Sequence, residues 1–337
     1  MAKTQRYFLS DIHLSSQNLY DGGYAWFKKP KHQTRLINFI DQYILGNSKV
    51  KDVILLGDIF DTWVCPADTK PPTYDEIFDA NREILTKFNE ITANGIELFY
   101  VNGNHDYDLT ESEIKKVIPK AHLIKKYSTS LLRAEHGNRF DEIFNNPDYF
   151  CDPAFGLPIG YIMSRLVASI TTTGYSLFDL PTYLDDIVEA AGTDQNIFES
   201  IIEGLAERAG LGESGGIVMP NGSKLTIENA KARYKKLEQK YSFSDFIREL
   251  WDRSSLGWQA DRMCIKEDLK IVVFGHSHKA TIDKDFFLTK DRIYANTGSW
   301  CLENAYSVMV EKGKSFKVTL LKIDPEGKVV QKTSETV

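Results

Sequence analysis

Residues 271–278 read IVVFGHSH, an apolar run that ends at a glycine and two histidines set two positions apart. A continuous β-branched and aromatic run of this length is typical of a buried strand. Residues two apart in an extended segment project to the same side, so His276 and His278 can face one site. The whole chain contains only seven histidines. Because imidazole is a common metal ligand, this stretch predicts a metal site at the end of a strand.

Four earlier apolar runs are also followed by polar residues. They are YFLS before Asp11, VILLG before Asp58, ELFYVNG before Asn104 and SLLRA before His136. Helical patterns over 34–45 and 74–93 lie between the early runs and give an alternating β/α order. Sites in open α/β sheets form at the carboxyl ends of strands, so we expect these side chains to meet there. Three later runs, RIYANTG, YSVMVEK and FKVTLLKI, predict antiparallel strands that close a second sheet.

The residues after these runs have the chemistry of metal ligands and of groups that support them. They are Asp11, His13, Asp58, Asp61, Asn104, His105, Asp106, His136, His276 and His278. Imidazole and carboxylate ligands with one amide oxygen suit manganese, iron or zinc, in contrast to soft thiolate sites. The number of ligands exceeds what one such ion uses, and a shared carboxylate can bridge a pair. We therefore expect two divalent ions, a known arrangement for phosphoryl transfer.

The order of these motifs resembles the signature of the calcineurin-like metallophosphoesterases. That signature is D-x-H, G-D-x-x-D, G-N-H-[DE], a single His and G-H-x-H, and all five elements occur here in sequence. The resemblance covers roughly residues 4–146 and 266–323. It implies an α/β fold, a four-layer αββα sandwich of two mixed sheets. We expect residues 1–146 and 266–337 to form this catalytic core, with 147–265 as an inserted helical cap.

The resemblance also implies a role for each residue. One ion would be held by Asp11, His13 and His278, the other by Asn104, His136 and His276, and Asp58 would bind both. His105 would act as an acid or stabilise charge beside the substrate, and Asp106 would orient it. Asp61 would support the ligands without binding an ion itself. The implied reaction is hydrolysis of a phosphoester or diphosphate by a hydroxide that bridges the ions. Two dications less the carboxylates of Asp11 and Asp58 leave a charge of about +2, which attracts a phosphate anion.

Each residue taken alone has a structural alternative. Asp11 and Asp58 could cap helices, and Asp61 could complement a helix dipole. Asp106 could be a turn residue. His136 could be a hydrogen-bonded core histidine, and His122 competes for its role. The five motifs together favour the metal centre.

The expected cap has helical periodicity and two surfaces of interest. An apolar stripe on one helix could supply a groove for acyl chains, or it could simply pack on neighbouring helices. The helix face comprises Ile159, Ile162, Leu166, Val167 and Ile170, and the groove would be lined by Ile159, Ile162, Met163, Leu166 and Val167. A basic face could meet anionic groups or remain solvated. Its residues are Lys231, Arg233, Lys235 and Lys236. Residues 210–224, rich in glycine, predict a mobile connector.

Composition limits the function classes. A formal net charge of −6 argues against a stable nucleic-acid partner. The four cysteines contain no C-x-x-C pair, so we expect neither a disulfide framework nor a zinc knuckle. The first residues lack the apolar segment of a cleaved signal, and we expect a cytoplasmic protein.

The expected substrate is a phosphorylated small molecule or a lipid-linked phosphate. The GDIFDTW stretch and the helical insertion are similar to the UDP-2,3-diacylglucosamine hydrolase branch, whose typical members carry Arg where this chain has His105. Protein phosphatase, nuclease and cyclic-nucleotide phosphodiesterase rank lower. Peripheral membrane contact through the cap is a further expectation, and oligomeric state is left open. The alternative to an enzyme is a protein-binding scaffold that has lost its metals. Activity that chelation abolishes and manganese restores would distinguish the enzyme from the scaffold.

Overall fold

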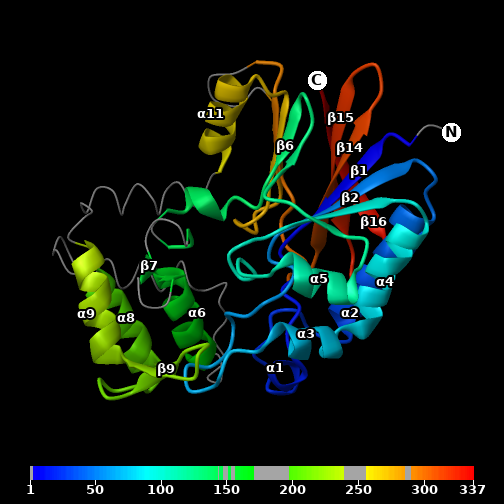
Figure 1. Ribbon diagram of the computed structural model, residues 1–337. Coiled ribbons are helices and arrows are strands. Elements are labelled where there is room, and N and C mark those ends of the chain that lie inside the picture. Colours follow the sequence, from blue (N-terminus) through cyan, green and yellow to red (C-terminus); the bar gives the residue numbers. More distant parts are fainter. Residues whose placement is uncertain are drawn as a thin grey trace.

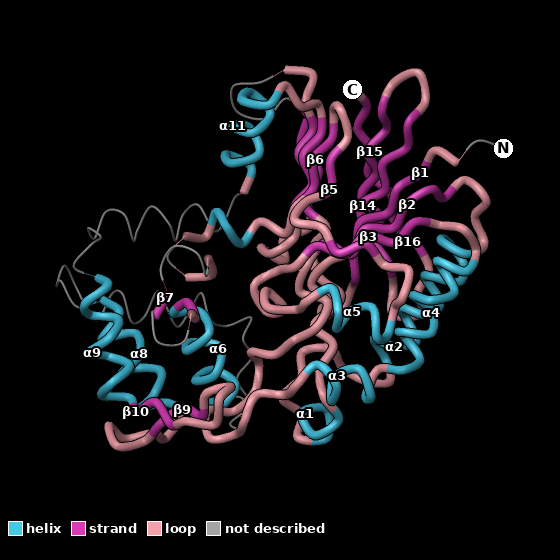
Figure 2. Tube along the Cα trace, in the orientation of Figure 1, coloured by secondary structure: helices cyan, strands magenta, loops and turns pink. Residues whose placement is uncertain are grey.

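The computed structural model describes residues 3–142, 144–146, 151–152, 156–170, 197–238, 256–284 and 290–337. Two mixed β-sheets stand face to face with helices outside both of them (Figure 1). A separate group of helices lies to one side, as Figure 2 shows. The predicted four-layer sandwich is confirmed.

The first sheet has seven strands in the order β16-β15-β14-β1-β2-β3-β4. Strands β1 to β4 run parallel, and β14, β15 and β16 join the edge of β1 in antiparallel fashion. Their bounds are β1 Gln5–Leu9, β2 Val50–Leu56, β3 Glu97–Val101, β4 His122–Leu123, β14 Ala305–Lys312, β15 Phe316–Ile323 and β16 Val329–Thr336.

The second sheet has five strands in the order β12-β13-β11-β6-β5. Strand β11 is parallel to both β13 and β6, while β5 and β12 are antiparallel edge strands. Their bounds are β5 Tyr127–Ser128, β6 Leu132–Ala134, β11 Ile271–Phe274, β12 Thr281–Lys284 and β13 Ile293–Asn296.

The three later runs are strands, and β14 and β15 pair in antiparallel fashion as predicted, but the expectation that all three close a second antiparallel sheet was wrong. Strand β13 runs parallel to its neighbour β11, and β14 and β15 belong to the first sheet. Alternation within a strand shows which residues share a face, but it does not show which sheet edge the strand joins.

Side-chain alternation along the central strands explains the layers. Val53 and Leu55 of β2 face the helices, whereas Ile54 and Leu56 face the second sheet. Successive residues of a strand point to opposite faces, so a strand buried on both sides is apolar throughout. The apolar runs of the sequence are therefore strands between two layers.

The helices outside the first sheet are α2, α3, α4 and α5, with short α1 beside them (Figure 1). Their bounds are α1 Gln17–Asp21, α2 Lys31–Phe39, α3 Tyr74–Ala80, α4 Arg82–Ala93 and α5 Glu111–Val117. The helical pattern over 34–45 spans the end of α2 and a π-helical segment, Ile40–Leu45. The pattern over 74–93 is divided at Asn81, whose side chain donates to the backbone oxygens of Ser15 and Ile77.

The outer face of the second sheet is covered by α11 (Gly257–Glu267). Ala260, Met263 and Cys264 of this helix pack on Val272 and Phe274 of β11. The boundary expected near residue 265 therefore falls inside a helix that contacts the core sheet. The division into core and cap remains a prediction.

Three helices form the side group, α6 (Ile159–Ile170), α8 (Ile197–Arg208) and α9 (Ile227–Glu238). Two short hairpins accompany them, β7 Cys151–Asp152 with β8 Leu157–Pro158 and β9 Gly216–Val218 with β10 Lys224–Thr226. The expected connector over 210–224 thus contains most of a β-hairpin.

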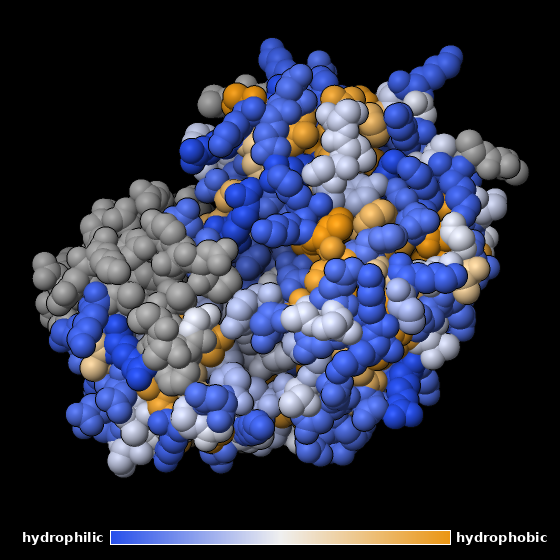
Figure 3. Space-filling view, in the orientation of Figure 1, coloured by the Kyte–Doolittle hydropathy of each residue, from blue (hydrophilic) through white to orange (hydrophobic). Residues whose placement is uncertain are grey.

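The visible surface is mostly hydrophilic, with hydrophobic residues in small scattered patches (Figure 3). Among the helices of the described ranges, none combines the length and apolar character needed to cross a bilayer.

Candidate metal centre

Five of the expected ligands share an unusual backbone conformation. Asp11, His13, Asp58, His276 and His278 have φ values between 53° and 66°. Non-glycine residues seldom adopt this left-handed region, and such strain concentrates at functional sites. Each of these residues follows a strand, so the backbone turns sharply where the strand ends. The turn after β1 is fixed because the amides of Ile12 and His13 donate to the Asp58 carbonyl, at 2.9 and 3.0 Å.

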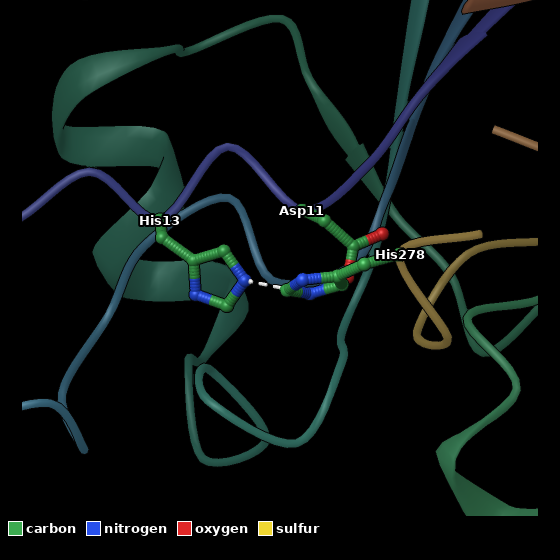
Figure 4. Close-up of side chains that lie close together, drawn as sticks. All are labelled: Asp11, His13 and His278. Carbon is green, nitrogen blue, oxygen red and sulfur yellow. Dashed lines mark hydrogen bonds and ion pairs between the residues drawn. The ribbon is translucent and has the colours of Figure 1, made fainter. Parts of the chain in front are cut away.

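Asp11, His13 and His278 form a first ligand group. Figure 4 shows the three side chains directed toward one another. The Nε2 atoms of His13 and His278 are 3.3 Å apart, and His278 Nε2 lies 3.0 Å from Asp11 Oδ1. Burial lowers the pKa of His13, while its Nδ1–H donates to Asp61 Oδ2 at 3.0 Å. The lone pair on His13 Nε2 therefore points into the group, as a metal ligand requires.

Asp58, His136 and His276 form a second group. His136 Nε2 lies 3.1 Å from Asp58 Oδ2, and its Nδ1 donates to the Leu56 carbonyl at 2.8 Å. Burial alone would lower the pKa of His136, but the Asp58 carboxylate outweighs it and raises this pKa to about 9. Burial would likewise raise the pKa of Asp58, but the imidazoles of His136 and His105 hold it well below its ordinary value. A cation in this group would replace the proton that the pair otherwise shares.

Asp58 lies between the two groups. Atoms of Asp58, His13 and His105 that could bind a metal also lie close to one another. Asp58 therefore has a neighbour in the first group, His13, as well as its partners in the second. Its Oδ1 accepts from the backbone amide of His105 at 2.8 Å, while Oδ2 faces His136. This position fits a carboxylate shared by two ions.

Asn104 supplies the amide oxygen. The side chain is 2% exposed, and its Oδ1 has no hydrogen-bond partner. An unsatisfied buried oxygen is costly, and a divalent ion would satisfy it. The donor set of histidine nitrogens, carboxylates and one amide oxygen thus fits borderline divalent ions. All seven predicted ligands lie at strand ends facing this region, and their role as ligands stays a prediction.

Asp61 holds two histidines at once. Its Oδ2 accepts from His13, and its Oδ1 accepts from His105 Nδ1 at 3.0 Å. The amides of Trp63 and Val64 also donate to Oδ1, both at 2.9 Å. Burial alone would lower the pKa of His105, but the carboxylates of Asp61 and Asp58 raise it to about 9.

The expectation that Asp106 orients His105 was wrong, because Asp61 makes that contact. The Asp106 carboxylate accepts from the amides of Gly103 and Ile59, at 2.6 and 2.8 Å, and from the Tyr100 hydroxyl at 2.5 Å. Asp106 therefore ties the turn after β3 to the turn after β2. Chain neighbours of His105 could not reveal this, since the partner in space comes from another strand.

The glycines of the motifs make room for the ligands. A Cβ on Gly103 would overlap the Asp58 carboxylate, and a Cβ on Gly57 would overlap the His136 ring. A Cβ on Gly275 would likewise overlap the Ser10 hydroxyl and the Asp11 carboxylate. The motif glycines are therefore needed for close approach between neighbouring strand ends.

Two tryptophans at the site carried no predicted role. Trp26 lies beside His13, with ring centroids 4.6 Å apart, and beside His105 at 5.5 Å. Trp63 is tilted against His105 at 4.7 Å and meets Tyr161 of α6 edge-on at 5.7 Å. Trp63 appears in the GDIFDTW stretch, so its place near the motif was visible, whereas nothing in the sequence singled out Trp26.

The position of His122 excludes it as the alternative to His136. His122 is an exposed residue of β4 whose Nε2 lies 3.0 Å from Glu97, away from both ligand groups. The segment after β13 supports Asp11, because the Trp300 amide and the Ser299 hydroxyl both donate to the Asp11 carbonyl.

The apolar stripe of α6 packs inside the cap. Ile159, Ile162, Met163, Leu166, Val167 and Ile170 are at most 2% exposed, in one cluster with residues of α8 and α9. Among the described residues, the stripe is buried against its neighbouring helices, which supports the packing interpretation. On the basic face, Lys231 lies 3.1 Å from Glu203, and Lys235 lies 2.9 Å from Glu199.

A cleft of about 420 Å³ lies between loops beside the candidate site and the side group of helices. Thr62, Trp63 and Tyr107 line it from these loops, and Tyr161 and Asn221 from the side group. Trp63 and Thr62 also contact His105, so this cleft adjoins the candidate site.

Comparison with known proteins defines the family. The profile of the calcineurin-like phosphoesterases matches residues 6–280 of this chain. The chain belongs to this family.

Individual relatives match over a shorter region. A UDP-2,3-diacylglucosamine hydrolase of Neisseria meningitidis serogroup B is 28% identical over 101 residues, which is 30% of this chain and 33% of that protein. One from Vibrio cholerae is 29% identical over 100 residues, 30% of this chain and 32% of that protein. The match therefore spans about a third of these relatives.

Among solved structures, the chain is similar to GAP50, the anchor in the inner membrane complex of Plasmodium. That similarity has a TM-score of 0.43 at 10% identity and covers 99% of this chain and 90% of the other. A predicted phosphoesterase from Streptococcus pneumoniae gives 0.36 at 10% identity, covering 100% and 99%. Similarities this low say nothing about activity.

Proposed function

We propose that this protein is an enzyme that hydrolyses a phosphoester or diphosphate bond with two divalent ions. The observation that carries the proposal is the position of Asp58 at the ends of strands from both sheets, because it belongs to the second ligand group and also lies close to His13 of the first. Asp11, His13 and His278 would hold one ion, and Asn104, His136 and His276 the other. Such ions supply Lewis-acid polarisation of the phosphoryl oxygens and a nucleophilic water at neutral pH. Manganese, iron and zinc all suit this donor set.

His105 is the proposed proton donor. Its Nδ1 is held by Asp61, which leaves Nε2 as the atom that can reach the substrate. Without metal ions, burial is outweighed by the carboxylates of Asp61 and Asp58, which raise the pKa of His105 to about 9 and favour the protonated imidazole. From that position it would balance charge on the phosphate and give a proton to the leaving oxygen. Asp61 keeps the ring in place, and Asp106 holds the loop that carries it.

The narrower candidate is hydrolysis of a lipid-linked diphosphate, as the names of the Neisseria and Vibrio relatives suggest. The cleft between core and cap favours a substrate with a sizeable group beyond the reacting phosphate. This candidate does not require the α6 stripe as an acyl groove. Protein phosphatase, cyclic-nucleotide phosphodiesterase and non-catalytic scaffold remain less favoured. A cytoplasmic location and peripheral membrane contact stay predictions.

The test is a substrate panel with metal analysis of the same protein. Monoesters, diesters and nucleotide diphosphates, including a diacylated sugar nucleotide, would be assayed with manganese and again after chelation. We expect turnover that chelation abolishes and manganese restores, with diphosphates preferred. Metal-loaded protein that turns over no member of the panel would instead favour the scaffold.

Asp58→Ala tests the shared carboxylate. Loss of the carboxylate that is proposed to bind both ions should remove both ions and activity together, as measured by metal content after dialysis and by turnover. Asp79→Ala, whose carboxylate is 71% exposed, is the matched control and should behave as wild type. An Asp58→Ala protein that keeps two ions would refute the shared role.

A further inference from the structure

Asn145 contacts both sides of the second ligand group. Its Oδ1 accepts from Asn104 Nδ2 at 3.3 Å, and its Nδ2 donates to Asp141 Oδ2. That same Asp141 oxygen lies 3.2 Å from His276 Nε2. One amide therefore connects the Asn104 side chain, through Asp141, with His276. Asn145 is 6% exposed and Asp141 2% exposed, so both are buried.

The contact with Asn104 decides which atom of that residue faces the ions. An amide side chain can turn over and exchange its oxygen and nitrogen, and hydrogen bonds decide the orientation. Because Asn145 Oδ1 can only accept, it takes the NH₂ group of Asn104. The Asn104 oxygen, which has no hydrogen-bond partner, is then the atom left to bind a cation.

The cap contacts the same residue. Gly160, the second residue of α6, donates from its amide to the Phe144 carbonyl at 2.8 Å. A Cβ on Gly160 would overlap Asn145 Oδ1 and the Phe144 oxygen. The first turn of α6 therefore rests directly on Asn145, and only glycine fits there without displacing it.

We infer that Asn145 is a positioning residue for the second ion, and that α6 fixes it through Gly160. The inference rests on the proposed function, since it concerns the ion held by Asn104, His136 and His276. Residues that hydrogen-bond to metal ligands orient those ligands, and loss of such a residue typically weakens metal affinity about 10–100-fold. The position of the cap would thereby set the occupancy of one ion and leave the other unaffected.

The experiment compares manganese binding by wild type, Asn145→Ala, Gly160→Ala and His276→Ala. Manganese content and affinity would be measured by titration, and electron paramagnetic resonance would distinguish a coupled pair from a single ion. We expect Asn145→Ala to lose about 10–100-fold in affinity for one ion, with a single-ion spectrum like that of His276→Ala. Gly160→Ala should show the same change.

The controls separate positioning from general damage. Gly212→Ala introduces a methyl group with no atom within 4 Å, so it should bind like wild type. The affinity for the other ion should be unchanged in Asn145→Ala, whereas simple misfolding would weaken both. Two ions bound by Asn145→Ala with wild-type affinity would overturn the inference and leave the proposed function intact. A wild-type protein that binds fewer than two ions would overturn the proposed function itself.

Discussion

At the scale of single residues, backbone strain and ligand chemistry coincide. Seven non-glycine residues in the described ranges have positive φ, and five of them are expected ligands. Asp and His are among the few side chains that adopt this conformation readily, though at a cost of order 1–3 kcal/mol. The cost is tolerated because the turn brings side chains of neighbouring strands within ligand distance. The five motifs could be recognised from residue type and spacing alone, before any contact between them was known.

His105→Ala tests the proton donor at this scale. We expect turnover to fall about 10²–10⁴-fold, most strongly for substrates with poor leaving groups, because general acid catalysis is lost. Metal content should stay normal, since His105 is not an expected ligand. Steady-state kinetics across a series of leaving groups would measure the effect. His122→Ala, which alters an exposed histidine, is the control. Loss of metal from His105→Ala would reassign the residue as a ligand.

Gly103→Ala tests whether the backbone at Gly103 must lie close to the Asp58 carboxylate. The new methyl group would displace the Asp58 carboxylate, so we expect weaker metal binding and a loss of about 1–3 kcal/mol in the free energy of unfolding. Denaturant unfolding of the metal-free protein measures the second effect separately from the first. Gly313→Ala, whose Cβ would meet no atom closer than 3.6 Å, should change neither quantity. Equal behaviour of the two variants would contradict the steric argument.

At the scale of elements, Arg165 explains how a charged residue fits an apolar helix. It lies on α6 with 0% exposure. Its guanidinium donates to the carbonyls of Cys65 and Pro66 at 2.9 and 2.8 Å, and to that of Val218 in β9 at 2.8 Å. These bonds join α6 to the loop that contains Cys65 and Pro66 and to the β9–β10 hairpin. A buried charge is tolerated only with such partners.

Arg165→Ala should therefore destabilise the docking of the cap. We expect a loss of about 3 kcal/mol or more, because several buried carbonyls would lose their donor together. Differential scanning calorimetry and proteolysis of the cap would detect it. Arg82→Ala, which removes an exposed pair with Asp79, should cost less than about 1 kcal/mol. If both variants unfold at the wild-type temperature, Arg165 does not anchor the cap.

At the scale of the whole molecule, the candidate ions would join the two sheets. Asp11 and His13 follow β1 of the first sheet, whereas His278 follows β11 of the second. The proposed ligands of the second ion likewise combine Asp58 and Asn104 from the first sheet with His136 and His276 from the second. Each ion would therefore reinforce strand ends that hydrogen bonds, such as that from His136 Nδ1 to the Leu56 carbonyl, already connect.

Metal removal should consequently lower global stability. A ligand present at 100 times its dissociation constant stabilises the folded state by about 2.7 kcal/mol per site. We expect the unfolding temperature to fall on chelation and to recover when manganese is added back. Thermal unfolding of wild type and Asp58→Ala would be compared, and the variant should not respond. A wild-type protein with the same unfolding temperature in chelator and in manganese would contradict this prediction.

The amino-acid sequence alone identified the main apolar strands, the candidate ligands and the resemblance to the family, but β12 and β16 were not predicted. Those features are local, because an apolar run specifies a buried strand and the residues that follow it specify the chemistry. The tertiary structure decided what depends on partners distant in the chain. It placed β14 and β15 in the first sheet, paired His105 with Asp61, and set Asn145 between Asn104 and Asp141. Such pairings follow from how strand ends and loops meet in space, which spacing along one segment does not encode.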